Sequence, residues 1–311
     1  MSTIFISEFI TSQAIETLRS KHTVIYEPDS YKQREALISA LHNSVALIVR
    51  NLTQVNQELI DAAPHLKVVG RLGVGLENIE LLACAQRNIK VIPATGANAD
   101  SVAEYVIGTA LALTRGLLPA TMQTRIGSWP RSQYSNFHEF TGKTLGIVGF
   151  GSIGRKTAIK AAAFGLKCIA YDPALNDKTV QLGSVSIPLM SFDDLLACSD
   201  VVTLHLPLLD QTRGLFSGAT LDKMKPGAYL INTARGGIVD ELALAERLRS
   251  GRLGGAALDV FEKEPATDIS HFDGLTNFIA TPHIAGVTSE SNERVCNMIA
   301  DEVIQFLEVS K

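Results

Sequence analysis

The chain has 311 residues, a formal net charge of −4, 46% hydrophobic residues and 19% charged residues. At about 150 residues per domain the length predicts two domains, and the hydrophobic content excludes an intrinsically disordered chain. An acidic balance without a basic block gives no electrostatic case for a nucleic-acid or membrane partner. No uncharged apolar run is long enough for a membrane span, and the N-terminus, with Glu8 inside its apolar stretch, does not resemble a secretory signal. The four cysteines form no C-x-x-C pair, so we expect no metal site, no disulfide framework and a cytoplasmic location.

Short β-rich runs alternate with amphipathic stretches over the first hundred residues. The predicted strands cover residues 4–6, 23–26, 45–49, 68–72 and 90–92. Strands that alternate with helices predict a parallel sheet covered on both faces.

The pattern changes near residue 97. Ser101 and Glu104 have the spacing of a capping box, which predicts the start of a long buried helix that continues to Leu118. Residues 119–142 are irregular and contain the only tryptophan, Trp129. This segment suggests an arm or a contact between subunits.

A second alternating block begins at Lys143. Its predicted strands cover residues 144–149, 167–171, 201–206, 228–232, 256–260 and 278–281. Residues 289–309 form an amphipathic helical pattern. The fold class predicted from these patterns is α/β, with two doubly wound parallel-sheet domains.

The strongest motif is a glycine-rich turn between a strand and a helix. Gly149, Gly151 and Gly154 have the G-x-G-x-x-G spacing, which permits a tight turn, close approach of a pyrophosphate, and close packing of helix on strand. Asp172 ends the next strand, 18 residues beyond Gly154, where a carboxylate accepts hydrogen bonds from ribose hydroxyls and repels a 2′-phosphate. The motif therefore predicts NAD rather than NADP. The alternative is a structural turn followed by a loop.

Three polar residues follow later strands of the same block. Arg235 lies beside two glycines and suits bidentate capture of a carboxylate; Glu264 and His283 follow the next two strands. Each alone has an ordinary explanation, as a solvated charge, a surface acid or a turn residue. Because open α/β sheets bind ligands at the carboxyl ends of their strands, the three together predict an active site.

Five stretches carry a resemblance to a known family. They are residues 69–75, 142–154, 232–240, 257–265 and 281–286. The chain resembles the D-isomer-specific 2-hydroxyacid dehydrogenases over its whole length, especially the D-3-phosphoglycerate dehydrogenase branch. The resemblance implies catalytic roles for Arg235, Glu264 and His283. It also implies a Rossmann NAD-binding domain of residues 99–284 inserted into a flavodoxin-like substrate domain of residues 1–98 and 285–311, and a homodimer or larger assembly.

The resemblance further implies a set of cofactor contacts. Backbone groups at Ile153 and Arg155 would hold phosphates, the segment from His205 to Pro207 would lie along the adenosine half, and Asp259 would orient the carboxamide. The full set of implied cofactor-binding residues is Gly149, Gly151, Ile153, Gly154, Arg155, Asp172, His205, Pro207, Thr212, Thr233, Ala234, Asp259 and Gly286.

The mechanism we expect is hydride transfer between nicotinamide C4 and the keto carbon of a 2-keto acid. Arg235 and the backbone N–H groups of Leu72, Gly73, Val74 and Gly75 would hold the carboxylate. His283 would donate the proton in reduction and accept it in oxidation, and Glu264 beside it would favour imidazolium.

The substrate is predicted from further arginines. Arg50 follows the predicted strand 45–49, Arg71 ends the next strand, and Arg131 falls where related enzymes reach across a subunit interface. They suggest a second anion on the substrate, so we expect 3-phosphoglycerate first and 3-sulfolactate second. If they are ordinary surface charges, a hydroxypyruvate or glyoxylate reductase is expected instead.

Positions at which this chain differs from related enzymes limit the choice of substrate further. Val74 stands where phosphite dehydrogenases carry lysine, and formate dehydrogenases lack the glutamate present here as Glu264. The sequence ends soon after its last helix, so we expect no C-terminal regulatory domain and no feedback through one. A protein of this fold acting as an NAD sensor or corepressor is the remaining alternative.

Overall fold

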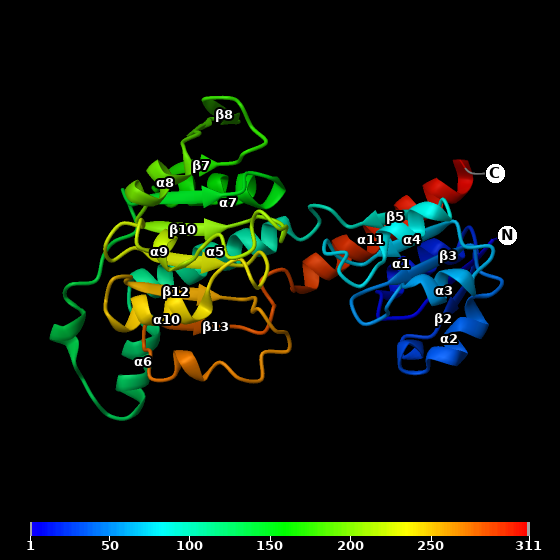
Figure 1. The fold of residues 1–311 in the computed structure, drawn as a ribbon, viewed down its shortest axis with the longest axis horizontal. Helices are drawn as coiled ribbons and strands as arrows, with labels where there is room; N and C mark the ends of the chain where they lie inside the picture. The colour runs from blue at the N-terminus through cyan, green and yellow to red at the C-terminus, as the bar shows by residue number, and fades with distance from the viewer. Residues whose placement is uncertain (1, 310–311) are drawn as a thin grey trace. The chain divides into compact units, whose positions relative to one another are not determined.

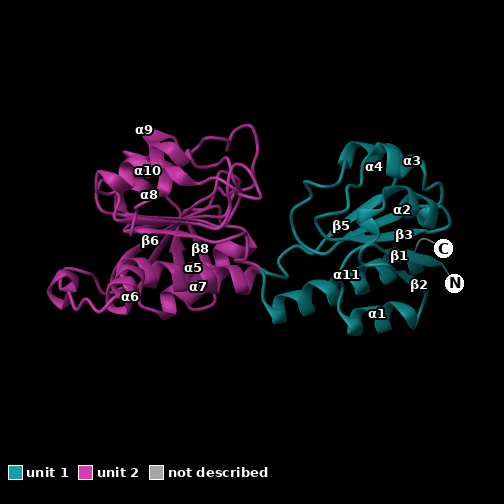
Figure 2. Ribbon diagram, turned by 90° about the horizontal axis from the view of Figure 1, so that it is seen from below, with its two compact units in different colours: residues 1–98, 287–311 teal, residues 99–286 magenta. Residues whose placement is uncertain are grey.

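The computed structural model describes residues 2–309. It divides into two compact units, one formed by residues 1–98 and 287–311 (unit 1) and the other by residues 99–286 (unit 2), coloured separately in Figure 2. Within the described residues, no helix has the length and apolar character needed to cross a bilayer.

Unit 1 is a five-stranded parallel sheet with the order β2-β1-β3-β4-β5. Its strands are β1 (Thr3–Ile6), β2 (Thr23–Tyr26), β3 (Ala46–Val49), β4 (Val68–Arg71) and β5 (Lys90–Pro93). The sheet order reverses between β1 and β3, because β1 pairs with β2 on one side and with β3 on the other. Such a switch point is where open α/β sheets bind ligands, outside the carboxyl ends of the strands.

Helices cover both faces of this sheet (Figures 1 and 2). The helices on one face are α1 (Ser12–Arg19) and α11 (Ser289–Val309), and those on the other are α2 (Arg34–Leu41), α3 (Gln57–Asp61) and α4 (Leu81–Gln86), with a 3-10 turn η1 (Ser30–Lys32) before α2. Alternate residues of β1 enter different cores: Ile4 and Ile6 pack with α1 and α11, whereas Phe5 packs with the helices of the opposite face. This alternation fixes the register of the strand.

Unit 2 is a six-stranded parallel sheet with the order β13-β12-β11-β10-β6-β7. Its strands are β6 (Thr144–Val148), β7 (Lys167–Tyr171), β10 (Val201–Leu204), β11 (Tyr229–Asn232), β12 (Gly255–Leu258) and β13 (Phe278–Ala280). An antiparallel hairpin, β8 (Thr179–Leu182) and β9 (Val185–Pro188), adjoins β7 through a parallel bridge from Ala170 to Leu189. The bridge occupies the place of the third strand in a dinucleotide-binding sheet.

The helices of unit 2 also form two layers (Figure 2). On one side lie α5 (Ala99–Thr114), α6 (Leu117–Arg125) and α7 (Ser152–Ala163), and on the other lie α8 (Phe192–Cys198), α9 (Gly218–Leu221) and α10 (Glu241–Arg249), with 3-10 turns η2 (Arg131–Tyr134) and η3 (Ser270–Phe272). The predicted fold class, two doubly wound α/β sheets, is confirmed.

The start and end of the predicted long helix are corrected. Helix α5 begins at Ala99, so the predicted cap Ser101 lies inside the helix, and Glu104 accepts a hydrogen bond from Lys160 Nζ at 2.8 Å. The helix also stops at Thr114, because Gly116 adopts a left-handed conformation with φ 59° before α6 begins. The prediction of one helix through Leu118 was therefore wrong.

Candidate active site

The glycine-rich turn follows β6 and opens α7. Gly149 has φ 94°, and a Cβ there would lie 2.5 Å from the carbonyl oxygen of His205. A Cβ on Gly154 would overlap the Gly149 carbonyl oxygen, whereas no atom lies within 4 Å of one on Gly151. The turn is therefore tight at two glycines and open at the third, where a pyrophosphate can approach the free N–H groups of α7.

Asp172 lies at the carboxyl end of β7, beside this turn. Its Oδ2 accepts a hydrogen bond from Phe150 N at 2.8 Å, and its Oδ1 accepts one from Ala174 N at 2.9 Å. Because each carboxylate oxygen can accept two hydrogen bonds, both keep a lone pair for ribose hydroxyls. Ile153 and Arg155 lie in the first turn of α7, as the sequence predicts.

The segment that carries Arg235 follows β11. The Asn232 side chain braces it: Oδ1 accepts from Ala234 N and Nδ2 donates to the Arg235 carbonyl, both at 3.0 Å. A Cβ on Gly236 would overlap the carbonyl oxygen of Phe261. The backbone after Arg235 is thus in direct contact with the segment that leads to Glu264.

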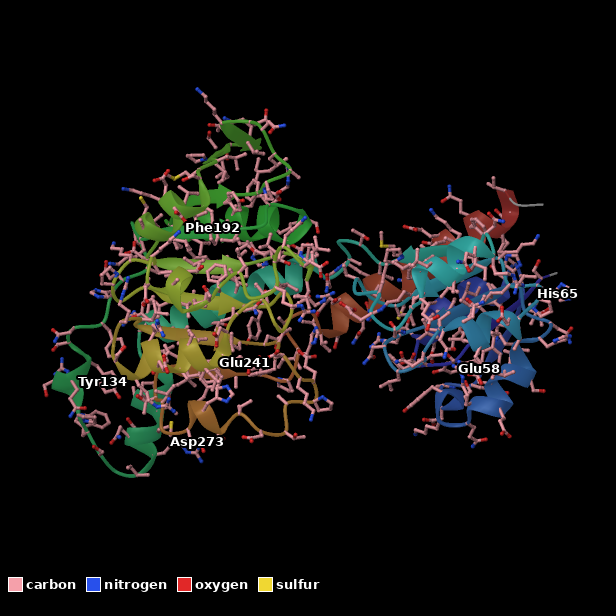
Figure 3. All side chains as sticks on the ribbon, viewed as in Figure 1. Glu58, His65, Tyr134, Phe192, Glu241 and Asp273 are labelled. Carbon is pink, nitrogen blue, oxygen red and sulfur yellow. The ribbon has the colours of Figure 1, made fainter. Side chains whose placement is uncertain are left out.

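Glu264 and His283 form a hydrogen-bonded pair. Glu264 Oε2 lies 2.7 Å from His283 Nδ1, and its Oε1 accepts from Phe261 N at 3.0 Å. The two side chains are 36% and 52% exposed. Glu241, labelled in Figure 3 at the start of α10, accepts a hydrogen bond from Glu262 N at 2.7 Å and so supports the same loop. Occupation of Nδ1 by Glu264 leaves Nε2 of His283 to face a substrate.

The backbone of His283 is left-handed, with φ 57°. Its N–H donates to the carbonyls of Asp259 and Thr281 at 2.8 and 3.0 Å. A non-glycine residue in this conformation is uncommon, although histidine, asparagine and aspartate tolerate it best. Contacts with neighbouring residues therefore hold the backbone of His283 in this conformation.

Asp259 supplies that support. Its carboxylate, in a residue only 1% exposed, accepts from Thr281 Oγ1 at 2.6 Å and from the N–H groups of Ile284 and Ala285 at 2.8 Å. Tyr105 Oη lies 2.6 Å from Thr281 Oγ1. Burial raises the pKa of Tyr105, which keeps it a donor. This network on either side of His283 has no signal in the sequence; contact of Asp259 with a carboxamide stays a prediction.

The remaining predicted cofactor residues lie after β10 and β11. Thr212 Oγ1 donates to the Pro207 carbonyl and accepts from Leu209 N, both at 2.7 Å, which closes the loop after β10. Thr233 Oγ1 is buried with no hydrogen-bond partner in the described part of the chain. Such an orphaned hydroxyl beside Ala234 fits a site that receives a polar ligand. Gly286 is the last residue of unit 2.

His205 is half-buried in this region. Its Nε2 lies 3.1 Å from Thr203 Oγ1, and its Nδ1 is buried without a hydrogen-bond partner among residues 2–309. Burial lowers the pKa of His205 from 6.5 to about 3. The imidazole is therefore neutral at physiological pH.

Acidification should destabilise the protein through His205. The unfolded chain binds a proton below about pH 6.5, but the folded chain does so only near pH 3, so stability falls as the pH decreases between these values. The contribution is at most about 1.4 kcal/mol per pH unit. Urea unfolding at pH 7 and pH 5 measures it. We expect a shallower pH dependence in His205→Asn, and an equally steep one would contradict this assignment.

The predicted substrate residues of unit 1 lie at the carboxyl ends of β3 and β4. Arg50 Nη2 donates to Asn292 Oδ1 at 3.0 Å, and its guanidinium carbon lies 5.6 Å from the centroid of the Phe9 ring. Arg71 Nη1 donates to the Leu72 carbonyl at 3.3 Å, and its guanidinium lies where a Cβ on Gly73 would be.

The glycine loop after Arg71 is partly engaged in internal hydrogen bonds. Leu72 N donates to the Val49 carbonyl and Gly73 N to the Arg71 carbonyl, each at 2.8 Å. Their N–H groups are therefore already used, and within the described residues only those of Val74 and Gly75 remain for a substrate carboxylate.

Arg131 is not brought to Arg235 within this chain. It begins η2, whose Tyr134 is labelled in Figure 3, in the arm of unit 2 that lies away from the carboxyl ends of the strands. Its predicted contact with substrate therefore requires another subunit.

Comparison with known proteins agrees with this geometry. Residues 107–285 match the family described as D-isomer specific 2-hydroxyacid dehydrogenase, NAD binding domain. The chain is 47% identical to an (S)-sulfolactate dehydrogenase of Chromohalobacter salexigens, over 99% of both chains. It is 38% identical to a D-3-phosphoglycerate dehydrogenase of Archaeoglobus fulgidus, over 97% of this chain and 57% of that one. A D-lactate dehydrogenase from Aquifex aeolicus, solved with NAD and lactic acid, covers 99% of this chain and 96% of its own with TM-score 0.81 and 28% identity.

Fold, glycine turn and comparisons together define an NAD-dependent oxidoreductase that acts on CH–OH groups. The chain belongs to the D-isomer specific 2-hydroxyacid dehydrogenases. The open space at Gly151, the free lone pairs of Asp172 and the orphaned hydroxyl of Thr233 fit NAD.

Proposed function

We propose that the substrate is a 2-hydroxy acid with a second anion on its tail, and that this acid is 3-sulfolactate, interconverted with 3-sulfopyruvate. The observation that carries the proposal is the pair of guanidinium groups, Arg50 and Arg71, that follow β3 and end β4, two neighbouring strands. Identity of 47% over 99% of a sulfolactate dehydrogenase supports sulfonate over phosphate. 3-Phosphoglycerate, the first expectation from the sequence, is the second candidate.

The prefix (S) in the name of that sulfolactate dehydrogenase agrees with an active site that accepts D-2-hydroxy acids. In sulfolactate the sulfur raises the priority of the CH₂ arm above that of the carboxylate. The (S) form therefore has the spatial arrangement that is called D in lactate and glycerate.

The side chains of unit 2 have separate tasks in this reaction. NAD supplies the hydride acceptor for oxidation and, when reduced, the hydride for reduction. Arg235 binds the substrate carboxylate through two parallel N–H groups. His283 holds the proton that is exchanged with the substrate oxygen, and Glu264 fixes its ring through Nδ1 at 2.7 Å.

We also propose a homodimer in the cytoplasm. The arm of unit 2 exposes large apolar side chains: Met122 is 62% exposed, Ile126 78% and Trp129 80%. A cluster of this kind on one segment is typical of a protein interface. All four cysteines are free thiols, which suits a reducing compartment.

Initial rates of NADH oxidation with five keto acids test the substrate proposal. The panel is 3-sulfopyruvate, 3-phosphohydroxypyruvate, hydroxypyruvate, glyoxylate and pyruvate. We expect kcat/KM to be at least about 100-fold higher for 3-sulfopyruvate than for hydroxypyruvate, which corresponds to about 2.7 kcal/mol. A preference for 3-phosphohydroxypyruvate would restore 3-phosphoglycerate as substrate, and equal rates with hydroxypyruvate would show that the arginines do not select.

A further inference from the structure

Glu8 is a buried acid that the catalytic scheme does not use. It lies two residues after the end of β1 and is 3% exposed. Its carboxylate accepts hydrogen bonds from four consecutive backbone N–H groups after β3, residues 50–53, which we call the Arg50 loop. Oε1 accepts from Arg50 N at 2.8 Å and Thr53 N at 2.9 Å, and Oε2 accepts from Asn51 N at 3.1 Å and Leu52 N at 3.0 Å.

Converging backbone N–H groups normally form a nest for an external anion. This nest lies after β3, where the sheet order of unit 1 reverses between β1 and β3. In sheets of this strand order, that switch point binds an anionic ligand. Here the chain supplies the anion itself. Four charge-assisted hydrogen bonds offset the cost of burying the carboxylate.

The hydrogen bonds leave Glu8 saturated. A carboxylate has about four acceptor positions, and the Arg50 loop fills two on each oxygen. The Glu8 carboxylate therefore pairs with the backbone N–H of Arg50 and its neighbours, and no acceptor position is left for the Arg50 guanidinium. Arg50 instead extends to Asn292 and over the Phe9 ring.

Other contacts hold the same loop. Ser7 Oγ lies 2.8 Å from Thr53 Oγ1, and Asn78 Nδ2 donates to the Thr53 carbonyl at 2.7 Å. Arg50 Nε is buried without a hydrogen-bond partner in the described residues, so the hydrogen-bonding capacity of the guanidinium is not filled. The backbone is thus fixed while the guanidinium retains capacity for an anion.

We propose that Glu8 is a positioning residue: it fills the nest at the switch point as a built-in anion and so pre-orients Arg50 for the tail anion of the substrate. This inference rests on the proposed function, because it assumes that Arg50 binds that tail. The position of the Arg50 guanidinium matters, because a displacement of about 1 Å from the productive geometry can cost about 100-fold in rate.

The experiment compares Glu8→Gln, Arg50→Gln and the double variant on 3-sulfopyruvate and on pyruvate, which has no tail anion. A glutamine places an NH₂ donor against two of the four N–H donors, so the Arg50 loop loses its fixed form. We expect E8Q to lower kcat/KM for 3-sulfopyruvate about 10- to 100-fold through a higher KM, with kcat nearly unchanged, because the tail contact is made equally in the ground and transition states. KM for pyruvate should stay within about twofold, and E8Q should add nothing in the R50Q background.

A second variant guards against a folding defect. Glu8→Ala empties the nest and leaves room for a small carboxylate, so added formate should restore a low KM for 3-sulfopyruvate, whereas chloride at the same ionic strength should not. Melting temperatures of all variants are measured in parallel.

The outcomes separate the two proposals. If R50Q loses tail selectivity but E8Q keeps it, or if E8Q harms both substrates equally, the role of Glu8 is overturned and the substrate proposal stands. If R50Q itself keeps selectivity, the tail site at Arg50 is overturned together with the inference built on it.

Discussion

Replacement of His283 by alanine should lower kcat for keto-acid reduction by about 10²- to 10⁴-fold. His283 Nδ1 is occupied by Glu264 at 2.7 Å, so Nε2 is the group placed to give a proton to the substrate oxygen. Stopped-flow and steady-state rates measure kcat, and fluorescence titration should show unchanged NADH affinity, because no predicted cofactor contact is lost.

Two further variants make this test specific. His283 has a left-handed backbone, which alanine tolerates poorly, so a loss of activity in H283A could reflect strain. Asparagine tolerates that backbone and cannot supply the proton. We expect H283N to lose kcat as strongly as H283A, and His65→Ala, at an exposed position of unit 1, to lose none. An H283N enzyme with near-normal turnover would refute the assignment.

Replacement of Arg235 by methionine should lower kcat/KM for every keto acid of the panel. Loss of one partner of a desolvated, hydrogen-bonded ion pair costs about 2–5 kcal/mol, which is about 30- to 5000-fold. The effect should be common to substrates with and without a tail anion, because all share the carboxylate. This distinguishes Arg235 from Arg50.

The controls for Arg235 separate charge from geometry. Arg235→Lys keeps the charge but loses the two parallel N–H groups, so its kcat/KM should lie between those of wild type and R235M. Arg19→Met removes a charge from an exposed end of α1 and should change nothing. If R235M lost activity on the tail-anion substrates alone, Arg235 would belong to the tail site and the carboxylate would be bound elsewhere.

The sequence predicts the parallel strands of both sheets well, misses the hairpin of β8 and β9, and predicts the helix ends less well. Buried parallel strands are short runs of apolar residues between turns, so their positions follow from local composition, as for Val201–Leu204. A helix end depends on contacts that are distant in the sequence. Glu104 lies 2.8 Å from Lys160 on α7, a contact between residues 56 positions apart that no local pattern shows.

The residues of the candidate site also differ in how far the sequence alone reveals their roles. Arg235, Glu264 and His283 could be found because each follows a strand of one sheet, and parallel strands end at a common edge. Glu8 and Asp259 act through backbone N–H groups of other segments, at separations of 42 to 45 residues for Glu8 and 25 and 26 for Asp259. A sequence shows that such an acid exists, but only the fold shows which amides surround it.

The contact at Gly236 has a consequence for how this enzyme can change. Because the backbone at Gly236 touches the backbone of Phe261, Gly236 cannot take a side chain unless the segment that leads to Glu264 shifts with it. The proposed tail site is built instead on Arg50 and Arg71, in a separate compact unit of the chain. New substrate preferences can therefore arise by mutation of unit 1 while the chemistry of unit 2 is inherited intact. Libraries for directed evolution of specificity belong in the loops after β3 and β4.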